Sequence, residues 1–476
     1  MKKIIYQVLP RLWGNGKLSS LDAGFLAYVK GLGVHSVWYT GIIRHASRFT
    51  GDKVVKGDAG SPYAITDYYD VNPYLAQDPA RRMEEFCQLV ERTHAAGLKV
   101  FIDFVPNHVA REYRGTLGAG DNTAVHWAPE NDFFYYPGEP LRLPLDCEGY
   151  SEMPARASGN CFTPAPGMND WWETVKINYC DFHTATWDKM LDIVRFWARK
   201  GVDGFRCDMV ELVPPQFMRW LIGSIKAEFP QLQFIAELYE KEKYRLYVEE
   251  VGFDLLYDKS GLYDTLRAVT CSGASAREIS WNWQFLGDLQ PRMLNFLENH
   301  DEQRLASDFF CGSAEGGYAA LGVSLLLNTA PFMLYFGQEM GERGMQAEGF
   351  SGLDGRTSIF DWCRVPALSK PDKAVQERYR TALALAGTAP FSEGKTFDLG
   401  YCQDGKGFDP DRHFAWLRSD GFSTWLVVAN FGPEAGITLR IPPEALAYLG
   451  IRLSRTEYFV KVNERDFLAF ETSGIA

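Results

Sequence analysis

Short apolar runs alternate with amphipathic stretches over most of this chain. Eight runs have the length and residue types of β-strands: 3–9, 36–40, 99–105, 203–208, 233–238, 253–258, 294–299 and 331–337. Several show no clean alternation of apolar and polar positions, as expected for strands that are covered on both faces. The stretches between them, among them 78–97 and 184–201, repeat apolar residues at helical spacing. Eight strand–helix units predict an α/β fold with a closed (β/α)8 TIM barrel.

This rhythm is interrupted in two places. Residues 109–182 contain Gly, Pro, Asn and clustered aromatic residues without a clear helix, and they are longer than a barrel loop needs. From about residue 391, strand-like runs alternate with turns, which is typical of an antiparallel β-domain. We therefore expect a barrel made of 1–108 and 183–390, a small domain inserted after the third strand (109–182), and a C-terminal antiparallel β-sandwich domain (391–476).

Composition narrows the class of protein. The 476 residues are 46% hydrophobic and 23% charged, which is typical of a soluble globular protein. The net charge of −12 argues against a nucleic acid or an anionic membrane as partner. The apolar run at the start is too short for a signal peptide, and the nine cysteines form no C-x-x-C pair, so we expect free thiols and a cytoplasmic protein. The oligomeric state stays open.

Polar and charged side chains follow the ends of several predicted strands. In a TIM barrel these carboxyl ends meet at one face, where active sites lie. Three of the ends present an acid beside or within an apolar run, and carboxylates that converge raise one another's pKa and cost stability. Such a site points to glycosyl transfer or hydrolysis, or to a bound metal ion. The residues concerned are Asp103, Asn107, His108, Arg206, Asp208, Glu211, Glu237, His300 and Asp301.

The residues themselves suggest separate roles for three acids. Arg206 and Asp208 lie two positions apart on one strand, so they share a face, and the arginine is expected to depress the pKa of Asp208 and keep it a nucleophilic anion. Glu237 stands between Ala236 and Leu238, an apolar setting that favours a protonated general acid. Asp301 would stabilise positive charge in the transition state.

Four segments in order resemble the motifs of the α-amylase family, glycoside hydrolase family 13: "DFVPNH" (103–108), "GFRCDMVE" (204–211), "IAELYE" (235–240) and "FLENHD" (296–301). "SPYAITDYY" (61–69) and "PFMLYFGQE" (331–339) resemble the family's segments after strand two and at strand eight. The resemblance implies a retaining hydrolase of α-1,4-linked glucans or malto-oligosaccharides that forms a covalent glycosyl-enzyme.

The resemblance also implies site residues. It makes Asp208 the nucleophile, Glu237 the general acid/base and Asp301 the transition-state stabiliser. The substrate-binding residues that it implies are Tyr63, which would stack on the sugar, His108 and His300, which would bind its hydroxyls, Arg206, which would orient Asp208, and Arg304 as a further subsite residue. Trp171 and Trp172 fit either distal subsites or burial in the inserted domain.

The chain departs from the family pattern at two points. Many relatives carry Lys-His where this chain has Glu211 and Leu212, which puts the choice of leaving group in doubt. Lys176 stands where the family often has an aspartate that binds calcium, and an ammonium group cannot coordinate a cation. Although Asn107 matches another calcium ligand, we expect no cofactor and no metal, with the charge of Lys176 in place of the ion.

Three other functions remain open from the sequence. A transglycosylase or an α-glucosidase acting on another α-glucoside would use the same covalent intermediate. A non-catalytic relative would keep the fold for binding, although such relatives should lose at least one of the three acids. A metal-dependent enzyme could use Asp103, His108, Asp208 and Glu237 as ligands.

Overall fold

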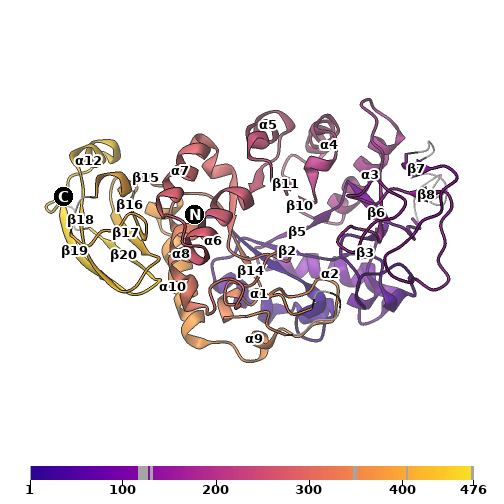
Figure 1. Cartoon of the computed structure of the whole chain (residues 1–476), viewed down its shortest axis with the longest axis horizontal. Helices are drawn as coiled ribbons and strands as arrows, with labels where there is room; N and C mark the ends of the chain where they lie inside the picture. The colour runs from indigo at the N-terminus through magenta and orange to yellow at the C-terminus, as the bar shows by residue number, and fades with distance from the viewer. Residues whose placement is uncertain are drawn as a thin grey trace.

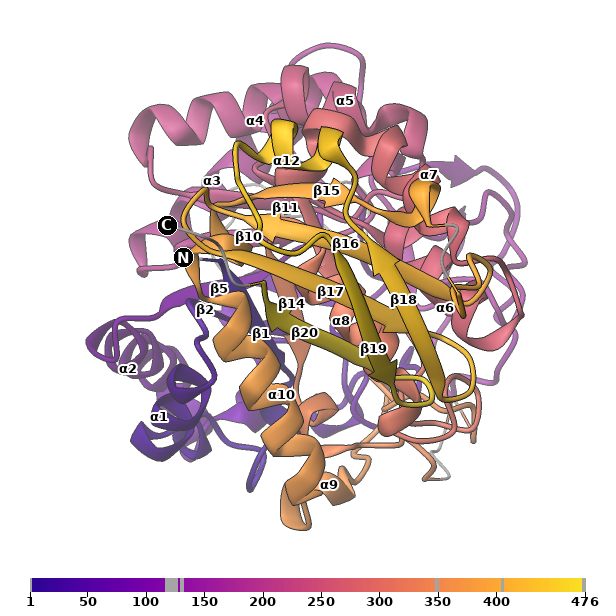
Figure 2. The same ribbon diagram turned by 90° about the vertical axis from the view of Figure 1, so that its left-hand side faces the viewer.

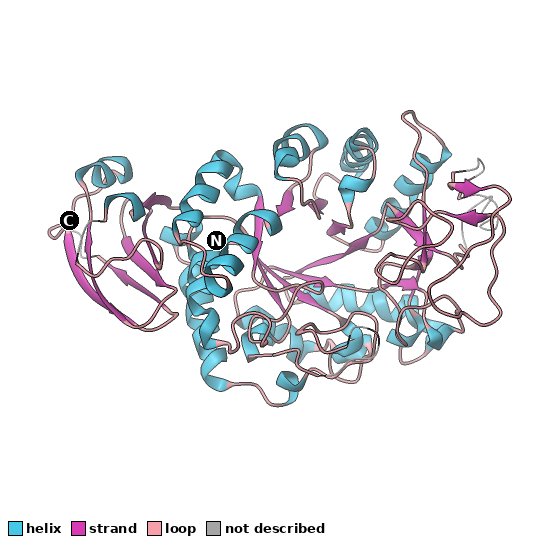
Figure 3. Cartoon of the chain, viewed as in Figure 1, coloured by secondary structure: helices cyan, strands magenta, loops and turns pink. Residues whose placement is uncertain are grey.

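The computed structural model describes residues 2–115, 127–128, 132–346, 350, 352–403 and 406–472. Eight parallel strands close into a barrel in the order β1-β14-β13-β12-β11-β10-β5-β2, and helices surround them (Figures 1 and 3). These strands coincide with the eight predicted ones and confirm the (β/α)8 barrel. Their bounds are β1 Ile4–Val8, β2 Ser36–Tyr39, β5 Lys99–Phe104, β10 Gly204–Cys207, β11 Gln233–Ala236, β12 Leu255–Tyr257, β13 Met293–Phe296 and β14 Phe332–Tyr335.

Two of the helices begin at a side-chain cap. Asp22 and Asp372 accept hydrogen bonds from the first-turn amides of α1 and α10, which satisfies donors that have no partner within the helix. The helices are α1 Ala23–Gly31, α2 Arg82–Ala95, α3 Ala185–Arg199, α4 Pro215–Glu228, α5 Tyr244–Leu246, α6 Asp264–Cys271, α7 Arg277–Leu286, α8 Tyr318–Leu326, α9 Pro366–Ser369, α10 Lys373–Ala386, α11 Ala389–Ser392 and α12 Pro443–Leu449. None of the helices in the described ranges is long and apolar enough for a membrane span.

Two antiparallel pairs stand over the carboxyl ends of the first barrel strands. β3 (Ile43–His45) pairs with β4 (Ile65–Val71), and neither strand is among the predicted ones; β4 carries two aspartates. One of them, Asp70, forms ion pairs with Arg44 at 3.0 Å and Arg82 at 2.7 Å, which offsets the cost of burying it. β6 (His108–Ala110) pairs with β9 (Thr174–Lys176) in the predicted insertion, which also holds β7 (Tyr135–Tyr136) and β8 (Ala155–Arg156). The domain boundaries stay a prediction.

The C-terminal residues form the predicted antiparallel structure. A four-stranded sheet of β15 (Lys395–Asp398), β16 (His413–Ser419), β17 (Thr424–Asn430) and β20 (Phe467–Glu471) lies beside the pair β18 (Ala435–Arg440) and β19 (Glu457–Val462) (Figure 2). Alternation along β16 assigns its two faces. Phe414 and Trp416 join the barrel's core, whereas Ala415 and Leu417 join a separate core with β18 and β19. The sheet therefore packs between the barrel and its own outer layer.

Candidate active site

Three acids from the ends of different barrel strands line one cavity of about 420 Å³. Asp208 directly follows β10, Glu237 directly follows β11, and Asp301 lies on the loop after β13. Tyr63 and His108 line the same cavity. The structure thus brings together five of the residues selected from the sequence, although their segments are far apart along the chain. Their catalytic roles stay predictions.

Arg206 lies beneath this cavity and is completely buried. Because alternate side chains of β10 face the barrel interior, its guanidinium points inward and reaches three carboxylates. Its nitrogens lie 2.7 Å from Asp208 Oδ1, 2.6 Å from Glu237 Oε1 and 3.8 Å from Asp103 Oδ1. One positive charge therefore ties together acids from three adjacent strands.

The protonation of Asp208 is set by more than this arginine. Burial raises its pKa well above the ordinary value and outweighs Arg206, which lowers it. The charges of Glu237 and Asp301 raise it further. Arg206 does lower the pKa of Asp208, as predicted. The net pKa is nevertheless raised, so the prediction of a depressed pKa was wrong. The reason is that burial destabilises the anion more than one shared cation stabilises it.

Glu237 does not lie in the apolar setting that its sequence neighbours suggest. Besides Arg206, its Oε2 accepts a hydrogen bond from the backbone N–H of Met209 at 2.9 Å, and its Oε1 accepts one from the hydroxyl of Tyr239 at 2.8 Å. Met209 has a φ of 41°, a left-handed conformation that costs a non-glycine residue about 1–3 kcal/mol. This strained residue ties the end of β10 to the acid on β11. The prediction of an apolar setting was therefore wrong.

Asp301 is held by a chain of polar side chains. His300 Nε2 lies 3.1 Å from Asp301 Oδ2, and His300 Nδ1 lies 2.8 Å from the amide nitrogen of Gln7. Because that amide donates, Nδ1 is the acceptor and Nε2 carries the proton; the hydrogen-bond partner of Nε2 is the hydroxyl of Tyr63, with the Asp301 carboxylate close by. Burial keeps the pKa of His300 well below its usual value, so the ring is neutral. Burial and the charge of Glu237 raise the pKa of Asp301 to about 7, although 38% of the side chain is exposed toward the cavity.

The aromatic and imidazole rings of the site are fixed by contacts below them. Tyr63 stacks on the ring of His300 at 5.3 Å and donates a hydrogen bond to Asp103 at 3.2 Å. His108 is buried, which lowers its pKa to about 3 and keeps it neutral, and its ring lies 5.2 Å from that of Trp171. Trp171 lines the cavity, as a subsite residue would, whereas Trp172 is fully buried. Each of the two alternatives for this pair thus holds for one of its residues.

Several cavity residues escaped the sequence reasoning. Lys56 and Glu173 form a buried ion pair at 3.2 Å in its wall, and Tyr239 and Phe350 also line it. Lys56 Nζ lies 5.8 Å from the ring of Phe350. Sequence spacing cannot predict that side chains from loops so far apart in the chain will meet. In this part of the chain, only the adjacent tryptophans at 171 and 172 stand out in the sequence. The other lining residues are Ser61, Met168, Asn169, Thr174, Met209, Ile359 and Phe360.

Lys176 occupies the position between the insertion and the barrel where the resemblance implied a calcium ligand. Its ammonium group donates to Asn107 Oδ1 and to the backbone carbonyl of Leu212 at 2.7 Å. Both oxygens that could bind a cation there are thus bound to a cationic group. Burial lowers the pKa of Lys176 to about 8. The residues present do not fit a calcium ion, because an ammonium repels it and takes its ligands.

Glu211, the other departure from the family pattern, binds the backbone of the loop after β11. Its Oε2 accepts hydrogen bonds from the backbone N–H groups of Tyr239 at 3.2 Å and Glu240 at 3.3 Å. It therefore joins the loop after β10 to the loop after β11. Tyr239 itself lines the cavity.

Arg304 does not belong to the site. It is fully buried, with one nitrogen 2.9 Å from Glu298 Oε2 and 2.9 Å from the carbonyl of Phe336, and with Nε bonded to Thr357 Oγ1 at 2.8 Å. Arg304 is not among the described residues that line the cavity. The prediction of a subsite residue was wrong, since the spacing from Asp301 does not reveal which way a loop side chain turns.

Comparison with known proteins identifies relatives. Residues 21–244 match the family model described as the α-amylase catalytic domain. Alpha-amylase 3 of Dictyoglomus thermophilum is 22% identical over 348 residues, which cover 71% of this chain and 61% of that protein. A cyclomaltodextrinase of a Bacillus species is 24% identical over 463 residues, covering 92% of this chain and 74% of the relative. The chain thus spans less than two thirds of the first of these relatives.

A solved structure shares the fold. The cyclic α-maltosyl-(1→6)-maltose hydrolase of Arthrobacter globiformis, in complex with cyclic α-maltosyl-(1→6)-maltose, superposes with a TM-score of 0.73 at 17% identity and covers 98% of each chain. At this identity the likeness concerns the architecture, including the C-terminal sheets.

We expect Arg304→Met to lower the free energy of unfolding by about 3–5 kcal/mol, because it leaves Glu298 as a buried unpaired charge. The double variant Glu298→Gln/Arg304→Met should recover part of that loss. Urea denaturation of the full chain measures both. In the folded variants the KM for maltoheptaose should stay at the wild-type value, and a KM raised several-fold at unchanged stability would return Arg304 to the binding site.

Proposed function

We propose that this chain is a retaining glycosidase of the α-amylase family that acts on α-1,4-glucosidic bonds of malto-oligosaccharides or starch-derived glucans. The match of residues 21–244 to the α-amylase catalytic domain supports this proposal. The observation that carries this proposal is the set of three acids around one cavity, two of them bridged by the buried Arg206. Retaining glycosidases need one carboxylate to attack and one carboxylic acid to protonate the leaving oxygen.

In the first step, the Asp208 carboxylate attacks the anomeric carbon while the protonated carboxyl group of Glu237 gives its proton to the glycosidic oxygen. The bond to the leaving sugar breaks, and a glycosyl ester forms on Asp208. In the second step, the Glu237 carboxylate takes a proton from water, whose oxygen attacks the same carbon and releases Asp208. Two inversions restore the original anomeric configuration.

The surrounding residues position the sugar and stabilise charge. The positive charge that develops on the ring lies near Asp301, which His300 orients from 3.1 Å. Neutral His108 lines the cavity and can donate to or accept from a hydroxyl group without adding charge. His300 is buried below the cavity, where its ring nitrogens are bound to Gln7 and Tyr63, so it supports the site rather than contacting the sugar. Tyr63 presents a ring held by His300 and Asp103, suited to stack on the sugar.

We expect Asp208→Asn to lower kcat for maltoheptaose at least about 10⁴-fold, since an amide cannot act as the nucleophile. Asp254→Asn is the matched control, because this aspartate pairs with Lys226 just before β12, at the opposite end of the barrel strands. Proton NMR of the wild-type products should show α-anomers first. Initial β-anomers would contradict the covalent mechanism, and products longer than the substrate would identify a transglycosylase.

The pH profile should reflect the raised pKa values of two acids. Burial raises the pKa of Asp208 well above its ordinary value and the pKa of Asp301 to about 7. Because both acids must be ionised for the reaction, kcat/KM should fall as the pH drops from 8 to 5. Below the governing pKa the fall should approach tenfold per pH unit. Steady-state rates on maltoheptaose in constant-ionic-strength buffers measure it. A rate that stays level down to pH 5 would contradict this assignment.

We further propose that Lys176 replaces calcium as the cation joining the insertion to the barrel. Its removal in Lys176→Met leaves Asn107 Oδ1 and the Leu212 carbonyl without their donor, which should cost about 1–3 kcal/mol of stability for each buried group. EDTA should leave the melting temperature of the wild-type protein unchanged. A melting temperature that falls with EDTA and returns with calcium would overturn this proposal. Lys189→Met, at another part-buried lysine that donates to a carbonyl, is the matched control.

A further inference from the structure

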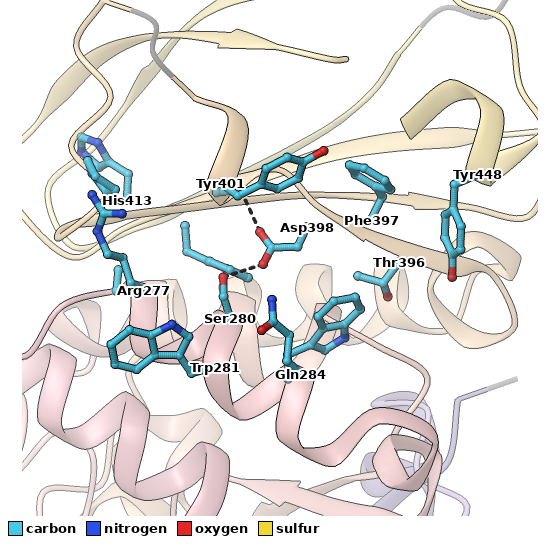
Figure 4. Close-up of a pocket in the computed structure, with 15 residues that line it drawn as sticks. Arg277, Ser280, Trp281, Gln284, Thr396, Phe397, Asp398, Tyr401, His413 and Tyr448 are labelled. Carbon is cyan, nitrogen blue, oxygen red and sulfur yellow. Dashed lines mark hydrogen bonds between the residues drawn. The ribbon is translucent and has the colours of Figure 1, made fainter. Parts of the chain in front are cut away.

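A second cavity, of about 430 Å³, lies between α7 and the C-terminal domain (Figure 4). It shares no lining residue with the cavity that holds the three acids. Its lower wall in the view is α7, which carries Arg277, Ser280, Trp281 and Gln284, and its upper wall is formed by residues of the C-terminal domain. The two walls are joined across the gap by the hydrogen bond from Ser280 Oγ to Asp398.

Aromatic rings stand open on both walls. Trp281 on α7 is 60% exposed, while Tyr401 and Tyr448 on the opposite wall are 65% and 53% exposed. Phe397 lies between the two tyrosines, with ring centroids 6.2 Å from Tyr401 and 5.8 Å from Tyr448. Large apolar side chains exposed singly are ordinary, but a cluster around a cavity marks a binding surface.

The polar groups of the cavity are mostly neutral or compensated. Asp398 is buried and accepts hydrogen bonds from Ser280 and from the backbone N–H of Gly400, the latter at 2.7 Å. Arg277 lies 3.6 Å from Asp411. Within the part of the chain that the structure describes, the indole N–H of Trp283 is buried without a hydrogen-bond partner. The wall therefore offers hydrogen bonding without a net charge to select an ion.

We propose that this cavity is a second, non-catalytic binding site for an α-glucan chain. A pyranose presents apolar C–H faces to aromatic rings and hydroxyl groups at its edges, which matches open rings beside uncharged polar groups. Among the described lining residues, Asp398 is buried and already accepts two hydrogen bonds from neutral donors, so it is not an open counterion for a cation. The chain's net charge of −12 disfavours anions. The choice of glucan rests on the proposed function, because the enzyme's own substrate is the sugar polymer it meets.

The site would act by holding a long substrate while the catalytic cavity works on it. Two linked binding events on one polymer raise the effective concentration of its ends at the active site. The benefit grows with chain length, because a short oligosaccharide cannot occupy both cavities at once. The position of the cavity between the barrel and the C-terminal domain gives this domain a role in substrate retention.

Isothermal titration of the full-length Asp208→Asn variant with maltoheptaose tests the proposal. We expect two binding sites per chain, one of which disappears when Trp281→Ala and Tyr401→Ala are added. Phe422→Ala, which removes a fully exposed ring elsewhere in the C-terminal domain, should keep both sites. Gln284→Trp, which leaves the walls in place and fills the space between them, should also abolish the second site.

The outcomes separate this site from the proposed function. One binding site in every Asp208→Asn variant, together with turnover of maltoheptaose by the wild-type protein, would overturn the second site and leave the proposed function intact. One site that Trp281→Ala/Tyr401→Ala removes, in a protein whose wild type releases no product, would support the second site and overturn the catalytic proposal. Two sites that persist in both Trp281→Ala/Tyr401→Ala and Gln284→Trp would also overturn the proposed location.

Discussion

The buried guanidinium of Arg206 is the interaction on which the catalytic end of the barrel depends. It contacts Asp208 and Glu237 at 2.7 and 2.6 Å, in an interior where an isolated charge would cost several kcal/mol. The barrel register makes these contacts possible, because Arg206 lies opposite Asp103 on β5 and Ile235 on β11. A shift of one residue would turn its side chain out of the barrel and leave the acids unpaired.

One positive charge cannot neutralise several carboxylates, and the properties of the site follow from this excess of negative charge. Burial and mutual repulsion keep the pKa values of Asp208 and Asp301 above their ordinary range. Both acids therefore take up a proton at a higher pH than an ordinary aspartate does, so their ionised forms depend on the pH of the solution. The strained Met209 and the hydroxyl of Tyr239 then hold Glu237 in place by hydrogen bonds. Stability is thus given up locally for reactivity.

The parts outside the barrel extend the same site in two directions. The insertion brings Trp171 and Glu173 to the cavity, and Lys176 fastens it to the barrel through Asn107 and Leu212. The C-terminal domain packs one face of its four-stranded sheet on the barrel core and forms the second cavity with α7. The insertion and the C-terminal domain lie on opposite sides of the barrel, at the two ends of the molecule's long axis (Figure 1).

The sequence by itself determined the eight barrel strands, the antiparallel C-terminal domain and the acids at the strand ends, because hydrophobic periodicity and local motifs are properties of neighbouring residues. Only the tertiary structure decided what surrounds those acids. Glu237 has apolar sequence neighbours but polar spatial ones, Arg304 turns away to Glu298, and Lys56 meets Glu173 across a cavity wall. Burial and long-range pairing set a group's charge, and neither is encoded in the residues next to it.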